Sequence, residues 1–399
     1  MLVTDSSSDE MRILMYEPSG SGGLSNYTES LCKALTATGA GVTWLTSSTY
    51  QASQSDLGGV RVIRSLKPLS RERRILRFRP YWALDRVART GNYSFQRNRL
   101  ANKMHPDVVH IQYLVPRVEQ YMLRGLLKQA PVVLTVHDVL PHSEGPHWSR
   151  ASLQRVYDLA DHLIAHTRVN QRSLMEEFSI PARKLSLIAH GANLAKTVEP
   201  VAAKREIDVE SGAPAILFFG AIRRNKGLNI LLQALPEVIR EIGRCTLIIA
   251  GAMPFGEDFS EYQSVIEKTG VREYVSVNNR FISAEEVQYF FSAADVVVLP
   301  YTSFASQSSV LLQAYSYGKP VVVTNVGGLA EAVLEDQTGK VSQVSSKAIA
   351  KSIVAMLSDP KRLETASDNA REAIKKKYSW NIVAIETLRV YETLTAKND

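Results

Sequence analysis

The stretch that decides the fold runs from Asp295 to Glu331 and reads DVVVLPYTSFASQSSVLLQAYSYGKPVVVTNVGGLAE. The apolar run over Asp295–Pro300 is typical of a strand buried on both faces, and Pro320–Thr324 is a second β-branched strand. Between them, Val310–Tyr317 has apolar residues at helical spacing, and Gly318 suits the position just past a helix end. We therefore predict a strand–loop–helix–strand unit, with the loop at the carboxyl end of a parallel strand.

The loop of this unit is rich in small polar residues. A predicted helix N-terminus at Val310 follows the loop residues Ser306, Gln307, Ser308 and Ser309. The hydroxyl and backbone N–H groups at this helix end favour the binding of an anion. Gln313 lies about one turn into the helix and points back toward that end. The simpler interpretation is an ordinary βαβ unit with a serine-rich cap.

Length and composition set limits on the class of protein. A chain of 399 residues suggests two domains, and 45% hydrophobic with 22% charged residues is typical of a soluble globular protein. Residues 1–10 are polar and predict a disordered tail without a signal peptide. Two cysteines, Cys32 and Cys245, lie in apolar settings far apart, which predicts a reducing cytoplasm and no metal site or disulfide framework.

The first half begins with a strand, a loop and a helix. Arg12–Tyr16 predicts a buried strand, Glu17–Asn26 a Gly/Ser loop and Tyr27–Thr38 a helix. The loop lacks the G-x-G-x-x-G pattern of dinucleotide sites, because Ser25 replaces the third glycine. NAD binding is therefore not expected, although Gly22 and Gly23 allow a ligand to approach the backbone.

Later strands of the first half end in polar residues. Asp107–Tyr113 and Pro131–Asp138 predict buried strands, and residues at their carboxyl ends face the ligand crevice of a parallel sheet. His137 is the catalytic candidate here, with Tyr113 and Asp138 as acceptor-side candidates. A hydrogen-bonded core histidine is the alternative interpretation of His137.

The pattern restarts in the second half. Residues 191–212 have few large apolar side chains and predict a linker, after which Pro214–Gly220 predicts a strand. The following loop carries Arg223, Arg224 and Lys226, whose charges would repel one another unless an anion binds. A solvated turn is the alternative. We include Arg280 and Phe281, at the end of the predicted strand Val275–Phe281, among the donor-binding candidates.

These patterns predict an α/β protein with two doubly wound, Rossmann-like halves in tandem. The predicted parts are a tail over 1–10, a first domain over 11–195, a linker over 196–212, a second domain over 213–377 and a final helix over 378–399.

Residues 70–103 are unusually basic, with ten Arg or Lys against Glu72 and Asp85, and aromatic residues interleave with them. Such a stretch can lie on an anionic membrane surface. A solvated surface helix is the alternative, and nucleic acid is not expected as a partner because no recognition motif accompanies the charge. The net charge of +7 alone does not choose among anionic partners.

The two halves and their loops resemble retaining glycosyltransferase family 4, which has the GT-B fold, with two domains facing a cleft. The resemblance covers roughly Arg12 to Leu394. Gly22–Gly23 resembles the family's first-strand loop, His137-Asp138 its H-D pair at a strand end, and Gly220–Gly227 its diphosphate-binding loop. Ser379-Trp380 resembles the start of the family's last helix, which crosses back to the first domain.

Three positions depart from the family pattern. Lys226 matches the family's lysine, but the arginine position holds Ala221, and we expect Arg223 to replace it. The family's paired glutamates correspond to Ala305 and Gln313. Gln313 can still hydrogen-bond a ribose hydroxyl, and Gln307 or Ser308 would supply the sugar contact that Ala305 cannot make.

The resemblance implies transfer of a hexose from a nucleoside-diphosphate sugar to a hydroxyl, with retention and without a metal or other cofactor. UDP-glucose is favoured as donor and GDP-mannose comes next. The acceptor is expected to be a saccharide or lipid-linked saccharide in polysaccharide biosynthesis, with the protein cytoplasmic and peripheral on the inner membrane face. Two alternatives remain open: a nucleotide-sugar-binding protein without turnover, and a sugar-nucleotide epimerase.

Overall fold

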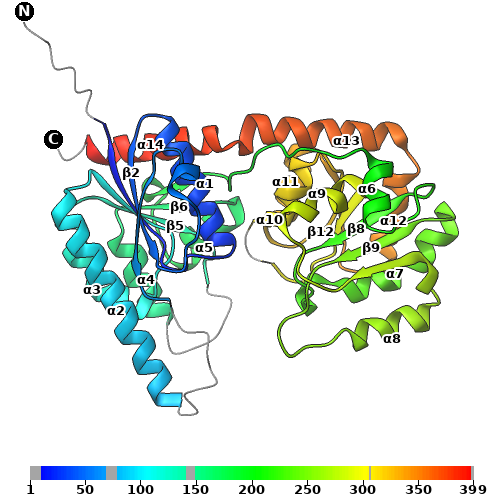
Figure 1. Ribbon diagram of the computed structural model, residues 1–399, viewed down its shortest axis with the longest axis horizontal. Helices are drawn as coiled ribbons and strands as arrows, with labels where there is room; N and C mark the ends of the chain where they lie inside the picture. Colours follow the sequence, from blue (N-terminus) through cyan, green and yellow to red (C-terminus); the bar gives the residue numbers. More distant parts are fainter. Residues whose placement is uncertain (1–9, 69–78, 141–148, 305–306, 397–399) are drawn as a thin grey trace, which may run out of the picture. The chain divides into compact units, whose positions relative to one another are not determined.

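The computed structural model describes residues 10–68, 79–140, 149–304 and 307–396; the side chains of residue 54 and residues 79–86 are outside the description. The chain forms two compact units, one of Met1–Gly191 with Trp380–Asp399 and one of Ala192–Ser379. Each unit has a parallel sheet with helices around it (Figure 1). The predicted α/β class with two doubly wound halves is therefore confirmed.

In the described part of the first unit, seven strands form a sheet in the order β3-β2-β1-β4-β5-β6-β7. Each pair is parallel, and the connections leave β1 and β4 in opposite directions, so a ligand crevice is expected beyond their carboxyl ends. The strands are β1 (Arg12–Tyr16), β2 (Gly41–Ser47), β3 (Arg61–Leu66), β4 (Val108–Ile111), β5 (Val132–Val136), β6 (His162–Ala165) and β7 (Leu185–Leu187).

Alternating side chains of β1 face two separate cores. Ile13 and Met15 pack in the core that contains residues of α1 and α14, whereas Leu14 and Tyr16 pack in the core with residues of α2 to α5. The C-terminal helix therefore supplies part of the first unit's core. The helices are α1 (Gly23–Ala37), α2 (Arg79–Met104), α3 (Pro116–Leu126), α4 (Arg150–Leu159), α5 (Arg168–Glu177) and α14 (Trp380–Thr395).

The second unit repeats the arrangement, with six described strands in the order β10-β9-β8-β11-β12-β13. The strands are β8 (Ala215–Phe219), β9 (Thr246–Ala250), β10 (Val275–Asn278), β11 (Val296–Leu299), β12 (Val321–Thr324) and β13 (Gly339–Ser342). The helices are α6 (Pro200–Glu206), α7 (Leu228–Ile242), α8 (Ser260–Thr269), α9 (Ala284–Ala293), α10 (Ser309–Ser316), α11 (Gly327–Asp336), α12 (Ser346–Leu357) and α13 (Pro360–Ala373). A π-helical turn over Ile374–Tyr378 follows α13.

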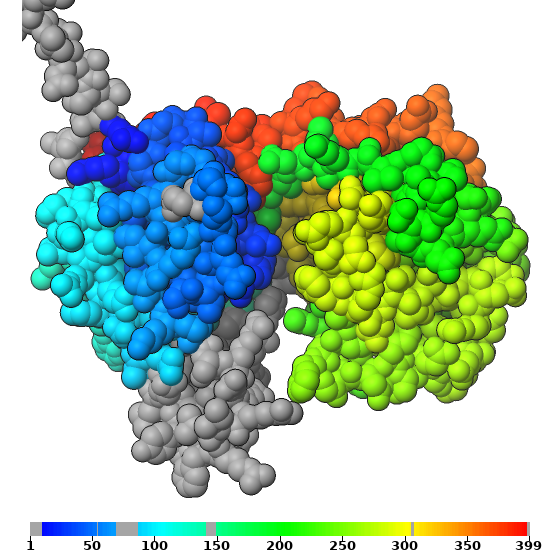
Figure 2. All heavy atoms as spheres, in the orientation of Figure 1, coloured from blue at the N-terminus to red at the C-terminus, as the bar shows by residue number. Residues whose placement is uncertain are grey.

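The segment 196–212, expected to be a linker, contains helix α6 and belongs to the second unit. Figure 2 shows α6 (green) on the surface of that unit beside α9 (yellow), against which it packs. Within α6, Ala203 is fully buried and the buried amine of Lys204 donates to the Ala213 carbonyl over 2.8 Å. A seven-residue helix with a small apolar face does not produce the long apolar period that predicts a helix.

The basic stretch 70–103 includes α2, but residues 69–78 lie outside the described residues. Within α2, Arg97 is fully buried, and its guanidinium forms two hydrogen bonds of 3.0 and 2.9 Å with the Glu119 carboxylate of α3. Arg97 therefore does not belong with the cations expected to face a membrane, which corrects that part of the prediction. Arg99 and Lys103 are exposed. No described helix is both long and apolar enough to span a bilayer.

Candidate functional site

The cationic loop of the second unit follows β8, where Arg224–Lys226 form a 3-10 turn before α7. Gly227 ends this turn in the left-handed conformation, with φ of 72°, and a Cβ there would lie 1.8 Å from the Pro300 carbonyl oxygen. Only glycine fits this position. The Thr302 N–H donates to the Asn225 carbonyl over 2.9 Å, so this loop packs on the loop after β11.

Lys226 lies between the two loops. Its Nζ is 3.7 Å from the centroid of the Tyr301 ring and 4.8 Å from that of Phe304, which are cation–π distances. Burial, helped by the charge of Arg223, lowers the pKa of the Lys226 amine to about 8. The amine therefore lacks some of its solvation, and an anion that binds it would restore the favourable environment of the charge.

Helix α10 begins beside this loop. Ser308 caps it by accepting a hydrogen bond of 3.4 Å from the Leu311 N–H, and its hydroxyl lies 3.3 Å from that of Tyr301. Ser309 is exposed, and Gln307 and Gln313 are half-buried. Val310 approaches Gly220, where a Cβ would lie 3.3 Å from Val310 Cγ2. Ala305 and Ser306 lie outside the described residues.

The structure brings the lysine loop and the start of α10 together at the carboxyl ends of β8 and β11. Backbone N–H groups in the first turn of a helix have no intrahelical partner and attract negative charge. A phosphate at this place would meet Lys226 and these N–H groups together.

Two of the arginines predicted to bind the donor, Arg224 and Arg280, have acidic partners. Arg224 lies 3.2 Å from Glu261, and Arg280 lies 2.5 Å from Glu286 in α9. Phe281, next to Arg280, is 80% exposed. Arg223 and Arg224 line a cavity of about 820 Å³ whose other lining residues include Glu257 and Asp258. The charge of this cavity is mixed, so Lys226 is the predicted cation best placed to meet an anion.

In the first unit, the loop after β1 is held by a residue that sequence reasoning did not select. Glu17 is fully buried, and its carboxylate accepts hydrogen bonds from the Ser19 N–H over 2.6 Å and the Gly20 N–H over 3.3 Å. Burial raises the pKa of the Glu17 carboxyl. Gly22 has φ of 83°, and neither Gly22 nor Gly23 has a neighbour within 4 Å of an added Cβ. Their backbone is open to a ligand.

His137 follows β5 and is half-buried. The Tyr27 ring of α1 packs edge-on against it, with ring centroids 4.9 Å apart. His137 Nδ1 lies 3.3 Å from Nε2 of His166, and His137 Nε2 lies 2.9 Å from the side-chain oxygen, Oε1, of Gln112. Tyr113 and Asp138, both half-buried, are the neighbours of Gln112 and His137 in the chain.

His137 belongs to a group of histidines at four strand ends. His110 lies in β4, and His166 and His190 follow β6 and β7. Tyr27 contacts three of the rings, those of His137, His166 and His190. Sequence reasoning missed His166 and His190, although both resemble His137 in being polar residues that come just after a buried strand.

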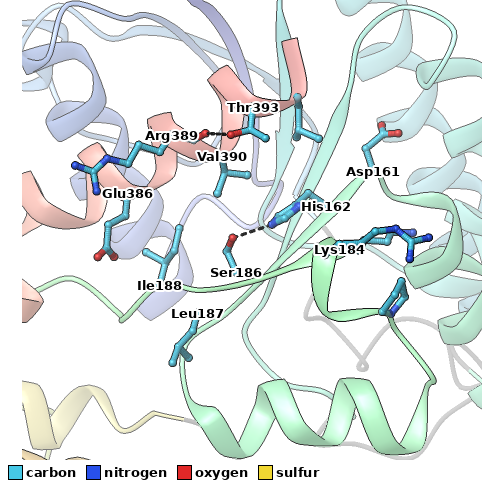
Figure 3. A pocket seen from close by; sticks show the side chains of 13 residues that line it. Asp161, His162, Lys184, Ser186, Leu187, Ile188, Glu386, Arg389, Val390 and Thr393 are labelled. Carbon is cyan, nitrogen blue, oxygen red and sulfur yellow. Dashed lines mark hydrogen bonds between the residues drawn. The ribbon is translucent and has the colours of Figure 1, made fainter. Parts of the chain in front are cut away.

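Another cavity, of about 490 Å³, belongs to the first unit and lies between the edge strand β7 and α14 (Figure 3). His162, the first residue of β6, and Ser186 of β7 face each other there at 2.8 Å. Charged side chains of both signs line it, including Lys184, Arg389 and Glu386. None of the predicted site residues lines this cavity, so we do not include it in the candidate site.

Two family models match this chain, one in each half. A model described as Glycosyltransferase Family 4 matches residues 21–196, and a model described as glycosyl transferases group 1 matches residues 213–359. An uncharacterised glycosyltransferase of Methanocaldococcus jannaschii is 27% identical, with 94% of this chain and 96% of that protein covered. A glycogen synthase of Mycobacterium tuberculosis is also 27% identical, with 96% and 94% covered.

Solved GT-B structures share the fold. Sucrose-phosphate synthase of Thermosynechococcus elongatus has a TM-score of 0.76 at 20% identity, covering 97% of this chain and 100% of that one. HepE of Anabaena, solved in complex with UDP, has a TM-score of 0.73 at 19% identity, covering 96% and 100%. The predicted GT-B fold is thereby confirmed, and the chain is a glycosyltransferase of the GT4/GT-B type.

Proposed function

We propose that this glycosyltransferase transfers a hexose from a nucleoside-diphosphate sugar to a hydroxyl of a saccharide or lipid-linked saccharide, with retention of anomeric configuration. The observation that carries the proposal is the position of Lys226, partly desolvated between Tyr301 and Phe304 and next to the start of α10. A desolvated amine beside a helix N-terminus suits an anion such as a diphosphate.

In the proposed reaction, the bond between the sugar C1 and the phosphate oxygen breaks, and a bond from C1 to the acceptor oxygen forms on the same face. The acceptor proton goes to the leaving phosphate. Lys226, Arg223 and the N–H groups of α10 stabilise the charge that develops on the diphosphate, and one such donor typically contributes ~3–4 kcal/mol to catalysis. Because these groups supply the positive charge, the proposal requires no metal ion.

UDP-glucose is the proposed donor, with GDP-mannose as the second choice. Support comes from HepE of Anabaena, which was solved with UDP-glucose, although its 19% identity to this chain shows the fold alone. Gln313 is proposed to hydrogen-bond the ribose, and Gln307 or Ser308 the sugar. Arg224, Arg280 and Phe281 are proposed to bind the rest of the donor, which requires Arg224 and Arg280 to leave their acidic partners.

The first unit is proposed to supply Gly22, Gly23 and His137 on the sugar side, and Tyr113 and Asp138 on the acceptor side. A lipid-linked acceptor in polysaccharide synthesis would require the protein to reach a membrane. The basic stretch 70–103, without Arg97, is proposed to bind the anionic cytoplasmic surface.

The first experiment is isothermal titration of UDP, GDP and their sugars against the wild-type protein and the double variant Arg223→Ala/Lys226→Ala. We expect one base to bind clearly and the variant to lose this binding. Incubation with the bound sugar nucleotide and an oligosaccharide panel, followed by NMR of the product's anomeric proton, then tests retention.

Three outcomes would contradict parts of the proposal. Equal binding by the double variant would place the diphosphate elsewhere. An inverted product would overturn the retaining mechanism. Loss of turnover in EDTA, restored by a divalent ion, would show that a metal is needed after all.

A further inference from the structure

The turn that follows β1 is built around the carboxylate of Glu17. The main chain of this residue continues the sheet, because its N–H donates to the Leu45 carbonyl of β2 over 3.1 Å. Its side chain is fully buried. Oε1 accepts from the Ser19 N–H over 2.6 Å and also contacts the Ser19 hydroxyl, and Oε2 accepts from the Gly20 N–H over 3.3 Å. Each carboxylate oxygen therefore faces a backbone N–H.

These contacts fit the ionised form of the carboxyl group. A backbone N–H can only donate, and an ionised carboxylate accepts at both of its oxygens. Burial raises the pKa of Glu17, and the hydrogen bonds from Ser19 and Gly20 act in the opposite direction. Within the described ranges, no lysine, arginine or histidine forms an ion pair with this carboxylate. The backbone of the turn therefore stabilises the charge, and the charge in return holds the turn.

Gly20 holds the turn from its other side. Its φ of 65° lies in the left-handed region, and a Cβ there would lie 2.6 Å from the Cβ of Ser47 at the end of β2. The backbone of Gly20 therefore packs directly on β2, while its N–H donates to the Glu17 carboxylate. A shift of the turn would separate the carboxylate from its donors or force Gly20 against β2.

The two glycines just beyond this turn are exposed. No atom lies within 4 Å of a Cβ added to Gly22 or Gly23. Gly22 is the N-cap of α1 and has no side chain that could cap the helix, and the first turn of α1, all of it described, contains no acidic residue. The N–H groups at this helix start are therefore open to a ligand, and the turn before them determines where they lie.

The position of the carboxylate favours a role beyond stability. Burial of a charge without a counter-ion costs free energy that an apolar side chain at the same place would not cost. Glu17 lies at the carboxyl end of β1, beside the crevice where a parallel sheet binds its ligand. Costly local arrangements are concentrated at such places, because they hold the backbone ready for a ligand.

We propose that Glu17 is a positioning residue of the transfer reaction. Its ionised carboxylate holds the turn of residues 18–21 so that the backbone of Gly22 and Gly23 meets the sugar of the donor, and Glu17 itself does not touch the substrate. This role rests on the proposed function, in which the second unit binds the diphosphate and the two glycines lie on the sugar side. The hydrogen bonds within the turn are a property of the protein alone.

The first experiment tests the turn by NMR of the full-length protein at pH 7 without any ligand. With ¹⁵N-serine labelling, the Ser19 amide is identified by its loss in Ser19→Ala, and we expect its proton far downfield because it donates to a carboxylate. With ¹³C-glutamate labelling, the Cδ signal that is lost in Glu17→Gln should have the shift of an ionised carboxylate. An ordinary Ser19 shift or a protonated Glu17 would overturn the proposal, whether or not transferase activity is found.

The second experiment separates the sugar from the diphosphate. Glu17→Gln keeps the shape of the side chain but replaces one acceptor oxygen by an NH₂ group, which cannot accept. In isothermal titration, we expect its affinity for UDP-glucose to fall about tenfold, as for one lost hydrogen bond to the ligand. Its affinity for UDP should stay at the wild-type value. GDP-mannose and GDP replace this pair if the wild type binds guanine nucleotides. Glu176→Gln, an exposed residue on α5, is the matched control and should change neither affinity.

Gly20→Ala disturbs the same turn without changing the carboxylate. Because its Cβ would collide with that of Ser47, the turn has to shift, and we expect the sugar nucleotide to bind more weakly while UDP binds as before. Gly125→Ala in α3 is the control, since its Cβ would lie at an ordinary distance of 3.5 Å from Asn98 Nδ2.

Two results with folded Glu17→Gln would overturn the proposal. Unchanged affinity for the sugar nucleotide would leave Glu17 a structural role only. An equal loss for UDP and for UDP-glucose would show that the effect does not act through the sugar.

The wild-type protein decides if the variants of the turn do not fold. UDP-glucose should then shift the amide signals of Gly22 and Gly23, whereas UDP should leave them in place, and the absence of this difference would overturn the proposal. A wild type that binds no sugar nucleotide would overturn the proposed function and with it the role toward the sugar. The ligand-free spectra of Ser19 and Glu17 would still show whether the carboxylate holds the turn.

Discussion

The amine of Lys226 lies 3.7 Å from the centroid of the Tyr301 ring, and this contact joins the loop after β8 to the loop after β11. The two strands are neighbours in the second sheet, so their carboxyl-end loops converge on one place. Among the described residues, no carboxylate forms an ion pair with this lysine, so its charge can serve a ligand.

Replacement of Lys226 by Met should weaken UDP binding about ten- to a hundredfold, because a hydrogen bond to a charged group contributes ~1.5–3 kcal/mol. Isothermal titration measures the change. Lys268→Met, an exposed lysine on α8, is the matched control and should bind UDP like the wild type. Equal affinities for both variants would remove Lys226 from the donor site.

Donor binding should depend on pH through the same amine. The pKa of Lys226 is lowered to about 8 in the free protein, and a bound diphosphate favours the protonated form. Binding therefore takes up a proton above this pKa. UDP affinity should be nearly constant between pH 7 and 7.5 and should fall above pH 8, by up to about tenfold per pH unit. In Lys226→Arg this decline should disappear, since arginine stays charged.

Gly227→Ala should destabilise the second unit and abolish donor binding. A left-handed conformation costs an alanine about 1–2 kcal/mol, and its Cβ would also collide with the Pro300 carbonyl. Gly243→Ala is the control at the other end of α7: its φ is 83°, yet no atom lies within 4 Å of the added Cβ. A thermal melt should show a larger loss for Gly227→Ala. Equal melting temperatures would mean that the two loops separate easily.

Sequence reasoning predicted the strands of both sheets well where the strands are buried on both faces, as in Val296–Leu299 and Val321–Thr324. It missed β3, Arg61–Leu66, because an edge strand can expose arginines that break the apolar run. The sequence predicts an anion site at the loop of Lys226, since cations crowded on a short loop after a strand repel one another unless an anion binds, and this stays a prediction.

Other contacts could not be predicted from the sequence, because they join residues that only the fold brings together. The partner of Arg97 is Glu119, 22 residues away, and neither residue differs in sequence from an exposed charge. The hydrogen bonds of His110 with Thr135 and Tyr391 join β4, β5 and α14, and His110 and Tyr391 are 281 residues apart in the sequence. No periodicity within one segment carries that information.

Charge reversal at Arg73, Arg74 and Arg77 should abolish binding to vesicles that contain anionic lipid. Each basic residue near such a surface contributes about 1 kcal/mol, so loss of three weakens binding by roughly a hundredfold before the added repulsion. Sedimentation with liposomes measures this. The control reverses Arg240, Arg244 and Lys268, which are exposed in the second unit. Unchanged sedimentation of the first variant would contradict the membrane proposal.

The last prediction concerns the buried ion pair of Arg97 and Glu119. Arg97→Met leaves a carboxylate in the core whose other hydrogen bond comes from Ser94 Oγ over 2.6 Å, and breaking such a pair typically costs ~3–5 kcal/mol. The melting temperature should fall by roughly 10 °C. The double variant Arg97→Met/Glu119→Leu removes both charges and should recover most of that loss, because the desolvation penalty disappears together with the attraction. A double variant as unstable as the single one would show that shape, and not the unpaired charge, determines the stability at this position.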